Sequence, residues 1–350
     1  MNVLVIGAGA IGTFLAARLQ RAGVEVVLAA RPGMAAVIEE QGICLEEPGL
    51  APQRSRAAVA PGVPAALSGK RFDVAVLAVK AYHTEEVAQE LARAPARPAA
   101  LIAMQNGVGS EETLAEHLPG SAIIAGALTT PVAVVAPGHV RVARASFNCA
   151  FAPCAPYQDI SPLAALFVRA GFRTQTFGDF RSLKWSKLLM NILANAQSAI
   201  LGYTPAQIFA SPELANLEIR AWREARKVMR GLGLATVDLA GYPLRLVSPL
   251  IEHLPPAVLQ PLLGRVIAGG RGSKMPSLYY DLHPVSRGRS EIGWLNGAVH
   301  RHGQALGIAT PVNSTFYSIM ARLLAGEEEA GAWQGHPERL LAAVAEAEQD

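Results

Sequence analysis

The sequence has few cysteines and few charged residues, and each shortage excludes a class of protein. Its three cysteines are Cys44, Cys149 and Cys154, and none of them forms a CxxC pair, so we expect neither a disulfide framework nor a cysteine zinc site. Charged residues make up only 17% of the chain, the net charge is +3 and no run of Lys or Arg occurs. A nucleic-acid partner is therefore not expected.

Targeting segments and long uninterrupted apolar runs are also lacking. Residues 1–6 form a short strand-like run without the basic start or the cleavage site of a signal peptide. The most apolar stretches, 186–202 and 243–268, carry amides, charges or several prolines, which membrane helices rarely combine. We expect a cytoplasmic protein with no membrane partner. Because HExxH and GxSxG are absent, neither a metal site nor a serine nucleophile is expected.

The length and the apolar content predict two domains. A chain of 350 residues, 51% of them hydrophobic, is longer than one core usually organises. The first half alternates strand-like and helical patterns, as a parallel sheet of βαβ units does. The clearest strands are predicted at 2–6, 24–29, 73–79, 99–103 and 172–176.

After Gly178 the strand pattern gives way to helices. Asp179 is suited to cap a helix that runs to about residue 201, and further helices are predicted at 212–231, 290–306 and 311–325. We therefore predict an α/β protein, with an N-terminal Rossmann-type parallel-sheet domain (1–178) followed by a mainly helical C-terminal domain (179–350). The proline-rich segment 243–262 is expected to break into short pieces that cover either a cleft or a subunit contact, which leaves a homodimer open.

A glycine-rich turn follows the first strand directly and opens a helix. It consists of Gly7, Ala8, Gly9, Ala10, Ile11 and Gly12, in the pattern GxGxxG. In this context the first glycine permits the tight turn, the second lets the backbone approach a pyrophosphate, and the third allows close helix packing. The alternative is a strand–helix turn that binds no ligand.

Arg31 follows the second strand, where a domain that prefers NAD would place Asp or Glu. A guanidinium suits a 2'-phosphate, which a carboxylate would repel, so NADP(H) is the expected cofactor. The alternative is an exposed loop arginine. Lys80 ends another strand and either faces the cofactor or lies in solvent. Asn106 follows a fourth strand, at the sheet edge where ligands bind in open α/β folds, although Asn-Gly alone is usually a turn.

Lys187, Asn191 and Asn195 are spaced four residues apart in the helix predicted after residue 179. This spacing places them on one face. Amides among leucines are costly to bury without partners, so a polar ligand against this face is one hypothesis, and a solvated stripe is the other. Lys184 lies in the same helix. Glu291 starts a later predicted helix, where it either serves a ligand or complements the helix dipole.

Taken together, these segments resemble the ketopantoate reductase (2-dehydropantoate 2-reductase) family over nearly the whole chain. The matching pieces are GAGAIG at 7–12, VKAYHTEEV at 79–87, QNGVGSEE at 105–112, KWSKLLMNILAN at 184–195, PSLYYDL at 276–282, and EIGWLNGAV followed by GIATPVN. Their number and their order are far more specific than the glycine motif alone.

The resemblance implies a reaction and a role for each matching residue. In such enzymes NADPH reduces a 2-oxoacid while a lysine acts as general acid and a glutamate holds the resulting hydroxyl. By resemblance, Lys187 is the acid and Glu291 is the carboxylate. The same resemblance implies that Asn191, Asn195 and Ser277 bind the substrate and that Asn106 contacts both the substrate and the cofactor. It also implies that the 7–12 turn, Arg31 and Lys80 bind the cofactor.

Departures from the family pattern leave the substrate open. Ala196 stands where members often have proline, the segment LGYTPAQ lacks an asparagine that some members use, and residues 234–275 are long and apolar. Ketopantoate is the first substrate expected, with a larger 2-oxoacid or an opine-type imine as alternatives. A non-catalytic NADP-binding sensor is a further alternative, although such a protein need not retain both Lys187 and Glu291.

Overall fold

The computed structural model describes residues 1–271 and 274–349 and divides the chain into two compact units. Unit 1 comprises Met1–Gln105, Gly109–Lys184 and Leu239–Tyr242. Unit 2 comprises Asn106–Val108, Trp185–Asp238 and Pro243–Asp350. The sequence places the division after residue 178, whereas these contacts group residues 179–184 with the first unit.

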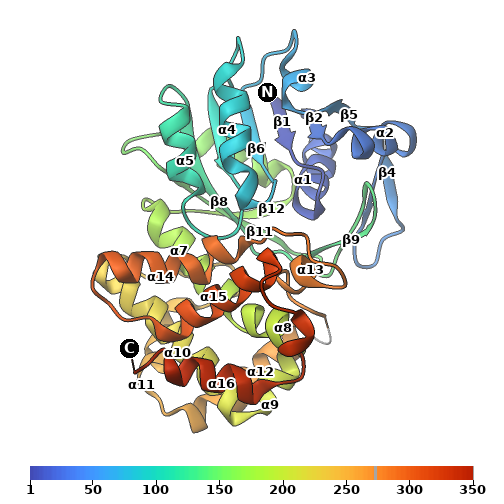
Figure 1. Cartoon of the computed structure of the whole chain (residues 1–350). Helices are drawn as coiled ribbons and strands as arrows, with labels where there is room; N and C mark the ends of the chain where they lie inside the picture. Colours follow the sequence, from blue (N-terminus) through green and yellow to red (C-terminus); the bar gives the residue numbers. More distant parts are fainter. Residues whose placement is uncertain (272–273, 350) are drawn as a thin grey trace. The chain divides into compact units, whose positions relative to one another are not determined.

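An eight-stranded sheet forms the centre of unit 1 (Figure 1). Its order is β12-β11-β8-β7-β6-β1-β2-β5, and every pairing is parallel except that of β8 with β11. The strands are β1 (Asn2–Ile6), β2 (Glu25–Ala30), β5 (Ala58–Pro61), β6 (Val74–Leu77), β7 (Ala100–Ala103), β8 (Ala122–Leu128), β11 (Phe147–Pro153) and β12 (Phe172–Thr176). Because β1 lies between β2 and β6, this is the Rossmann arrangement, and the predicted fold class is confirmed.

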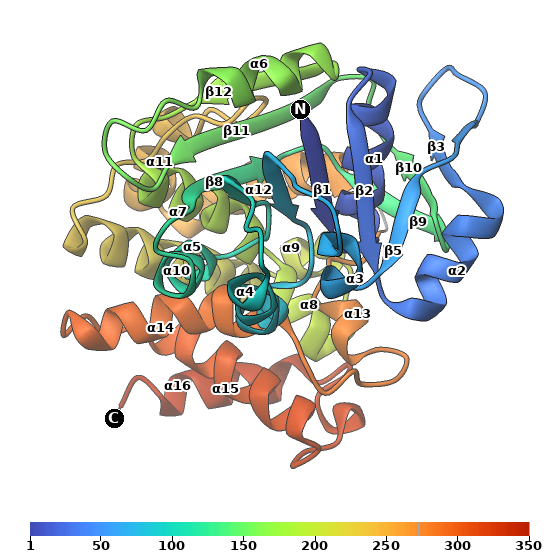
Figure 2. The same ribbon diagram turned by 90° about the horizontal axis from the view of Figure 1, so that it is seen from above.

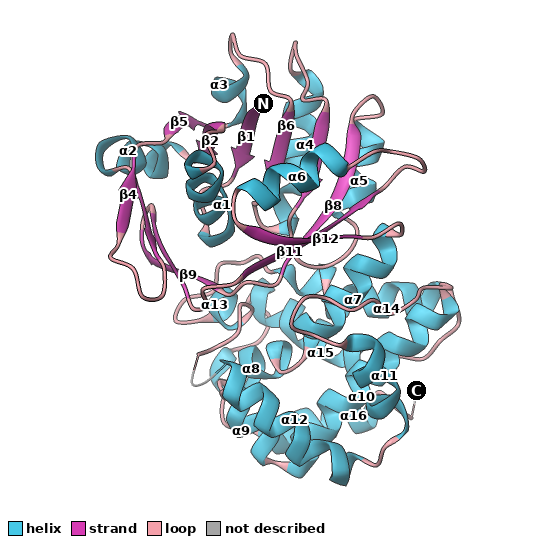
Figure 3. Ribbon diagram, turned by 180° about the vertical axis from the view of Figure 1, so that it is seen from behind, coloured by secondary structure: helices cyan, strands magenta, loops and turns pink. Residues whose placement is uncertain are grey.

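Helices cover both faces of this sheet, which explains its nearly continuous apolar strands. Figure 3 shows α1 (Ala10–Arg21) and α6 (Ser161–Arg169) on the near face, and Figure 1 shows α4 (Thr84–Arg93) and α5 (Ser110–His117) on the other. The short α3 (Val63–Leu67) packs on the same face as α4. Successive side chains alternate, so β1 contributes Val3 and Val5 to one core and Leu4 and Ile6 to the other. Figure 2 shows α6 along the edge formed by β11 and β12.

A second sheet of unit 1 was not predicted from the sequence. It has the order β4-β3-β10-β9, with β3 (Ile43–Glu46), β4 (Gln53–Ser55), β9 (Val132–Ala136) and β10 (His139–Val142). These strands are only three to five residues long, and β3 pairs with β10 from a distant part of the chain. Such short segments carry little periodicity of their own, because a remote partner determines their conformation. The remaining elements of this unit are α2 (Pro32–Gln41) and the 3-10 turn η1 (Ala81–His83).

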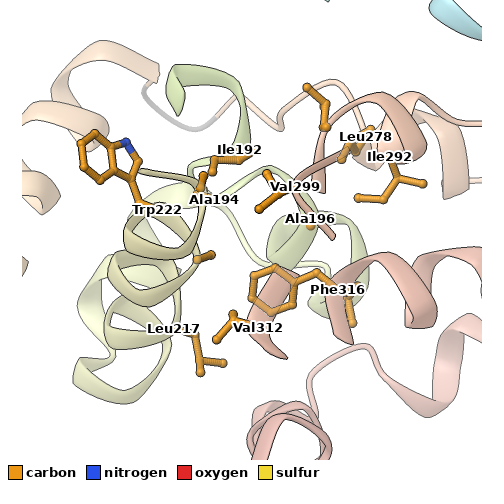
Figure 4. Packing of buried hydrophobic residues seen from close by; sticks show 14 of the residues in the cluster. Ile192, Ala194, Ala196, Leu217, Trp222, Leu278, Ile292, Val299, Val312 and Phe316 are labelled. Carbon is orange, nitrogen blue, oxygen red and sulfur yellow. The ribbon is translucent and has the colours of Figure 1, made fainter. Parts of the chain in front are cut away.

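Helices make up unit 2 throughout its described residues, as the sequence predicts. They are α7 (Phe180–Ile192, from Trp185 onward), α8 (Asn195–Leu201), α9 (Pro205–Ala210), α10 (Pro212–Gly231), α11 (Leu244–His253), α12 (Pro256–Arg271), α13 (Tyr279–Leu282), η2 (Glu291–Trp294), α14 (Asn296–Ala305), α15 (Pro311–Ala325), η3 (Ala330–Ala332) and α16 (Pro337–Glu346). The helices predicted at 212–231 and 311–325 are confirmed. In the core, Leu217 of α10 lies near Val312 and Phe316 of α15 (Figure 4).

The proline-rich segment forms two helices, so the prediction of short broken pieces was wrong. Pro249 lies inside α11 and Pro261 lies inside α12, and only the turn around Leu254 separates the two helices. Both rings are exposed, so water can satisfy the backbone carbonyls that proline leaves without a donor. Within the part of the chain that the structure describes, no helix combines the length and apolar character needed to cross a membrane.

Candidate functional site

The glycine-rich turn of unit 1 has the geometry of a dinucleotide-binding loop. Gly7 has φ +106° and donates its N–H to the carbonyl of Ala29 at 2.9 Å. A Cβ at Gly12 would lie 1.8 Å from the oxygen of Gly7, so only glycine allows α1 to start this close to the turn. A Cβ at Gly9, in contrast, would meet nothing within 4 Å. The turn is therefore closely packed at Gly7 and Gly12 and open at Gly9.

The surroundings of this turn suit an anion. The first turn of α1 carries no acidic residue and Gly9 supplies no side-chain cap, so the helix N-terminus is available to an anion. Arg31 follows β2 and is exposed, and its guanidinium makes no hydrogen bond or ion pair with the residues described. Lys80 follows β6 and is half-buried. Because β6, β1 and β2 are adjacent and parallel, these groups share the carboxyl edge of the sheet.

The helix predicted from residue 179 to about 201 is interrupted, which corrects the prediction of one continuous face. α7 ends at Ile192, Ala194 takes a left-handed conformation with φ 54°, and α8 begins at Asn195. The backbone N–H of Ala194 donates instead to a carboxylate oxygen of Glu218 at 2.7 Å. Glu218 is buried on α10. Its carboxylate therefore replaces the backbone carbonyl that would accept from the Ala194 N–H in a continuous helix.

Asn195 nevertheless remains next to Asn191, through side-chain hydrogen bonds across the break. Its Nδ2 donates to the carbonyl of Asn191 at 3.0 Å and to Oγ of Ser277 at 3.4 Å, and its Oδ1 accepts from the N–H of Leu278 at 3.0 Å. The Nδ2 of Asn191 donates to Oδ1 of Asn106 at 3.1 Å. The four polar residues predicted to hold substrate therefore form one hydrogen-bonded group in unit 2, which we call the amide cluster: Asn106, Asn191, Asn195 and Ser277.

Lys187 lies one helical turn before Asn191 on α7 and is half-buried. Glu291 begins η2, and the residue is only 3% exposed. The single helix predicted at 290–306 was wrong, because Leu295, with φ −108° and ψ −104°, separates η2 from α14. Since Ser290 already caps this four-residue turn by accepting from the N–H of Ile292, Glu291 is not needed to complement a helix end.

The segments around Ser277 and Glu291 are close neighbours within unit 2. Leu278 and Ile292, which follow these two residues in the sequence, are buried in the same core (Figure 4). Serine 277 itself is exposed. The amide cluster, Lys187 and Glu291 thus belong to one unit and to elements that share a core, although they are spread over most of the chain.

The turn that carries Asn106 is fitted closely to η2. Gly107 has φ +85°, and a Cβ there would lie 2.4 Å from the oxygen of Trp294. The N–H of Val108 donates to the same oxygen at 3.1 Å. A glycine is required at this position because both the backbone conformation and the space exclude a side chain.

Lys184 has surroundings in unit 1 that the sequence did not reveal. Its ammonium nitrogen lies 2.9 Å from Oε1 of Glu111, and the two side chains are 3% and 1% exposed. The ammonium also donates to the carbonyl of Gln105 at 2.6 Å and to that of Gly126 at 3.5 Å. Burial raises the pKa of Glu111, and the adjacent ammonium opposes this effect. The regular spacing of lysines along α7 gave no hint of this difference between Lys184 and Lys187.

The Rossmann sheet with its glycine turn, together with a helical unit that holds a lysine, a glutamate and an amide cluster, defines the class of Rossmann-type oxidoreductases. Comparison with known proteins agrees. The family model described as "Ketopantoate reductase PanE/ApbA" matches residues 3–154, and the model of its C-terminal part matches residues 179–323. The chain belongs to the ketopantoate reductase family.

Individual relatives are similar along their whole lengths. A 2-dehydropantoate 2-reductase of Archaeoglobus fulgidus is 26% identical over 93% of this chain and 98% of its own. The crystal structure of a PanE/ApbA family ketopantoate reductase from Ralstonia eutropha is 28% identical, with a TM-score of 0.77, and covers 93% of this chain and 99% of its own. The ternary structure of D-mandelate dehydrogenase with NADH and anilino(oxo)acetate has the same TM-score and the same coverage. Because it is only 19% identical to this chain, the similarity is one of fold alone.

Proposed function

We propose that the protein reduces a 2-oxoacid to the 2-hydroxyacid with NADPH, and that ketopantoate is the substrate. The membership of the chain in a family of reductases supports the reaction type, and the named relatives support the substrate. In this reaction the nicotinamide supplies a hydride to the 2-oxo carbon. The carbonyl oxygen must gain a proton as the C–H bond forms.

The residues at the carboxyl edge of the unit 1 sheet fit NADPH. The open middle of the turn at Gly9 and the N-terminus of α1 would hold the pyrophosphate. The exposed guanidinium of Arg31 would hold the 2'-phosphate by bidentate hydrogen bonds, and Lys80 would add a second cation. No carboxylate follows β2 to favour the 2'-hydroxyl of NADH.

Lys187 is the proposed general acid, and Glu291 is the proposed acceptor for the product hydroxyl. The Lys187 ammonium donates its proton to the oxygen that gains negative charge, while a buried carboxylate orients the hydroxyl that results. The amide cluster would hold the 2-oxoacid, because amides both donate and accept hydrogen bonds. Asn191 is one helical turn from Lys187, so substrate held there lies within reach of the ammonium.

The structure supports Lys187 over Lys184 as the acid. The Lys184 ammonium already serves Glu111 and two backbone carbonyls within unit 1, and it is almost completely buried. Giving up a proton there would leave the buried carboxylate of Glu111 without its cation. Lys187, in contrast, is only half-buried.

The observation that carries the proposal is the hydrogen-bonded chain from Asn106 through Asn191 and Asn195 to Ser277. It is tested by incubating the purified protein with NADPH or NADH and a panel of 2-oxoacids, and following the loss of the reduced-nicotinamide absorbance. We expect turnover with NADPH and ketopantoate. The panel includes larger aromatic 2-oxoacids and opine-type imines, and turnover of one of these alone would replace ketopantoate as the substrate. Binding of NADPH without oxidation by any of these compounds would instead indicate a sensor.

We also propose that the protein is a homodimer through α12. Val258, Leu262 and Val266 recur every fourth residue on this helix and are 47%, 50% and 71% exposed. Arg265 is the only charged residue in the segment 256–267, so two copies of this surface can meet with little like-charge repulsion. Leu262→Glu should halve the mass measured by light scattering, and Leu306→Glu, at another exposed leucine, should not. A wild-type protein of monomer mass would refute the dimer.

A further inference from the structure

The buried ion pair between Lys184 and Glu111 is the prominent feature of unit 1 that the proposed chemistry does not use. Its side chains come from α7 and α5, and both are almost inaccessible to water. Burying two charges is costly, and apolar side chains of similar volume often stabilise a fold as well or better. Stability alone is therefore a weak reason for this pair, and its hydrogen bonds point to another role.

The hydrogen bonds of the Lys184 ammonium reach the segments of two neighbouring strands. One goes to the carbonyl of Gln105, which follows β7, and a longer one goes to the carbonyl of Gly126 in β8. The side chain of Gln105 is anchored separately, because its Nε2 donates to Oγ1 of Thr84 at 2.8 Å. Gln105 is thus fixed through both its carbonyl and its side chain.

We propose that Lys184, oriented by Glu111, is a positioning residue that sets the direction of the Asn106 side chain. The carbonyl of Gln105 and the N–H and Cα of Asn106 belong to one planar peptide group. A hydrogen bond that fixes the carbonyl oxygen therefore also fixes the orientation of this N–H and the position of the Asn106 Cα. On the other side of Asn106, the N–H of Val108 is held by Trp294. Asn106 is therefore held at both ends as it accepts from Asn191 at 3.1 Å.

This inference rests on the proposed function, in which Asn106 holds the 2-oxoacid as a member of the amide cluster. It predicts that loss of the ammonium acts on the reaction through Asn106. Lys184→Met keeps an unbranched side chain as long as the aliphatic part of lysine and removes the ammonium donors. Because burial raises the pKa of Glu111, the carboxyl group can take up a proton once its partner is gone, which makes the variant tolerable to the fold.

A double-mutant cycle on kcat/KM for the 2-oxoacid tests this coupling. We expect Lys184→Met to lower kcat/KM about tenfold in the wild-type background and less than about twofold in the Asn106→Ala background, as for coupled neighbours. Equal factors in the two backgrounds would overturn the proposal. If Lys184→Met does not fold, Lys184→Met/Glu111→Leu removes both charges and enters the same cycle.

Arg18→Met is the matched control. It removes a partly buried ion pair with Glu47 elsewhere in unit 1, where Nη1 lies 3.0 Å from the carboxylate. This variant should lose thermal stability and leave kcat/KM for the 2-oxoacid unchanged. If kcat/KM of Arg18→Met fell as much as that of Lys184→Met, the loss of any ion pair in unit 1 would have this effect. That result would overturn the proposal.

A second measurement does not depend on turnover. Hydrogen exchange of the amides of residues 106–108 should be about tenfold faster in Lys184→Met and unchanged in Arg18→Met, because local opening frees the segment that Gln105 anchors. Unchanged exchange in Lys184→Met would overturn the positioning role. If the wild-type protein turned over no 2-oxoacid, the proposed function would fail, whereas the exchange result would still decide whether Lys184 holds the segment.

Discussion

Asn195→Ala offers a quantitative test of the amide cluster. The wild-type side chain makes three hydrogen bonds, two as donor and one as acceptor, and it is buried. The substitution leaves the buried N–H of Leu278 without its acceptor, which costs about 1–3 kcal/mol, and removes two further bonds worth about 0.5–1.5 kcal/mol each. Since Ser277 is exposed and can bond to water, we expect a total loss of about 2–4 kcal/mol in the free energy of unfolding.

Thermal unfolding and steady-state kinetics measure the two expected effects. For a unit of this size a loss of 1 kcal/mol lowers the Tm by about 2–4 °C, so the Tm should fall by roughly 5–15 °C. The KM for the 2-oxoacid should rise as well, because the amide that orders Ser277 is lost. Asn195→Asp keeps the acceptor for Leu278 but places a carboxylate oxygen against the carbonyl of Asn191, so it should raise KM and recover only part of the stability.

Asn313→Ala is the matched control for this prediction. Asn313 is a fully buried amide of the same unit, and its Nδ2 donates to the carbonyl of Ala221 at 2.8 Å and to Glu224 at 2.7 Å. Its loss should lower the Tm by at least as much and leave KM unchanged. An Asn195→Ala variant with wild-type KM, or an Asn313→Ala variant with the same rise in KM, would refute the role of the cluster.

Three further predictions concern unit 1. Arg31→Ala should weaken NADPH binding about 10- to 100-fold, as expected for lost hydrogen bonds to a charged group, and leave NADH binding unchanged in a fluorescence titration; equal losses for both cofactors would contradict the assignment. Gly12→Ala should abolish dinucleotide binding in the same titration, because its Cβ would overlap the oxygen of Gly7. Gly120→Ala, with open space around it, should bind normally. Retained binding by Gly12→Ala would contradict the assignment of this turn as the dinucleotide-binding loop. Burial raises the pKa of Cys149 to about 12, so this thiol should resist alkylation in the native protein at pH 8 and react after unfolding. Mass spectrometry measures the labelling, and rapid labelling of the native protein would contradict the burial of Cys149.

The parts of the fold that the sequence predicted are those with strong local patterns. The strand Asn2–Ile6 and the helices Pro212–Gly231 and Pro311–Ala325 were located closely, because apolar periodicity and terminal residues such as Pro311 and Gly326 mark them. The break at Ala194 was missed because its cause, Glu218, lies on another helix. Nothing in the segment around Ala194 itself departs from a helical pattern.

The candidate site shows the same division between local and distant information. The glycine turn and Arg31 were predicted as cofactor residues from their place after two strands, and Lys187 and Glu291 were predicted as catalytic residues from the family motifs. The pairing of Lys184 with Glu111, and the contact between Gly107 and Trp294, join residues far apart in the sequence and required the structure. Spacing along one helix could not distinguish Lys184, which is held in a buried ion pair, from Lys187, which is half-buried.

The central claim is that Lys187 delivers the proton as a 2-oxoacid is reduced. Rapid mixing of the NADPH complex with ketopantoate, under single-turnover conditions, measures this step directly in the wild-type protein and in Lys187→Ala. We expect a rate lower by about 100- to 10,000-fold in the variant, with NADPH affinity unchanged. A Lys187→Ala protein that oxidises NADPH at the wild-type rate would contradict it.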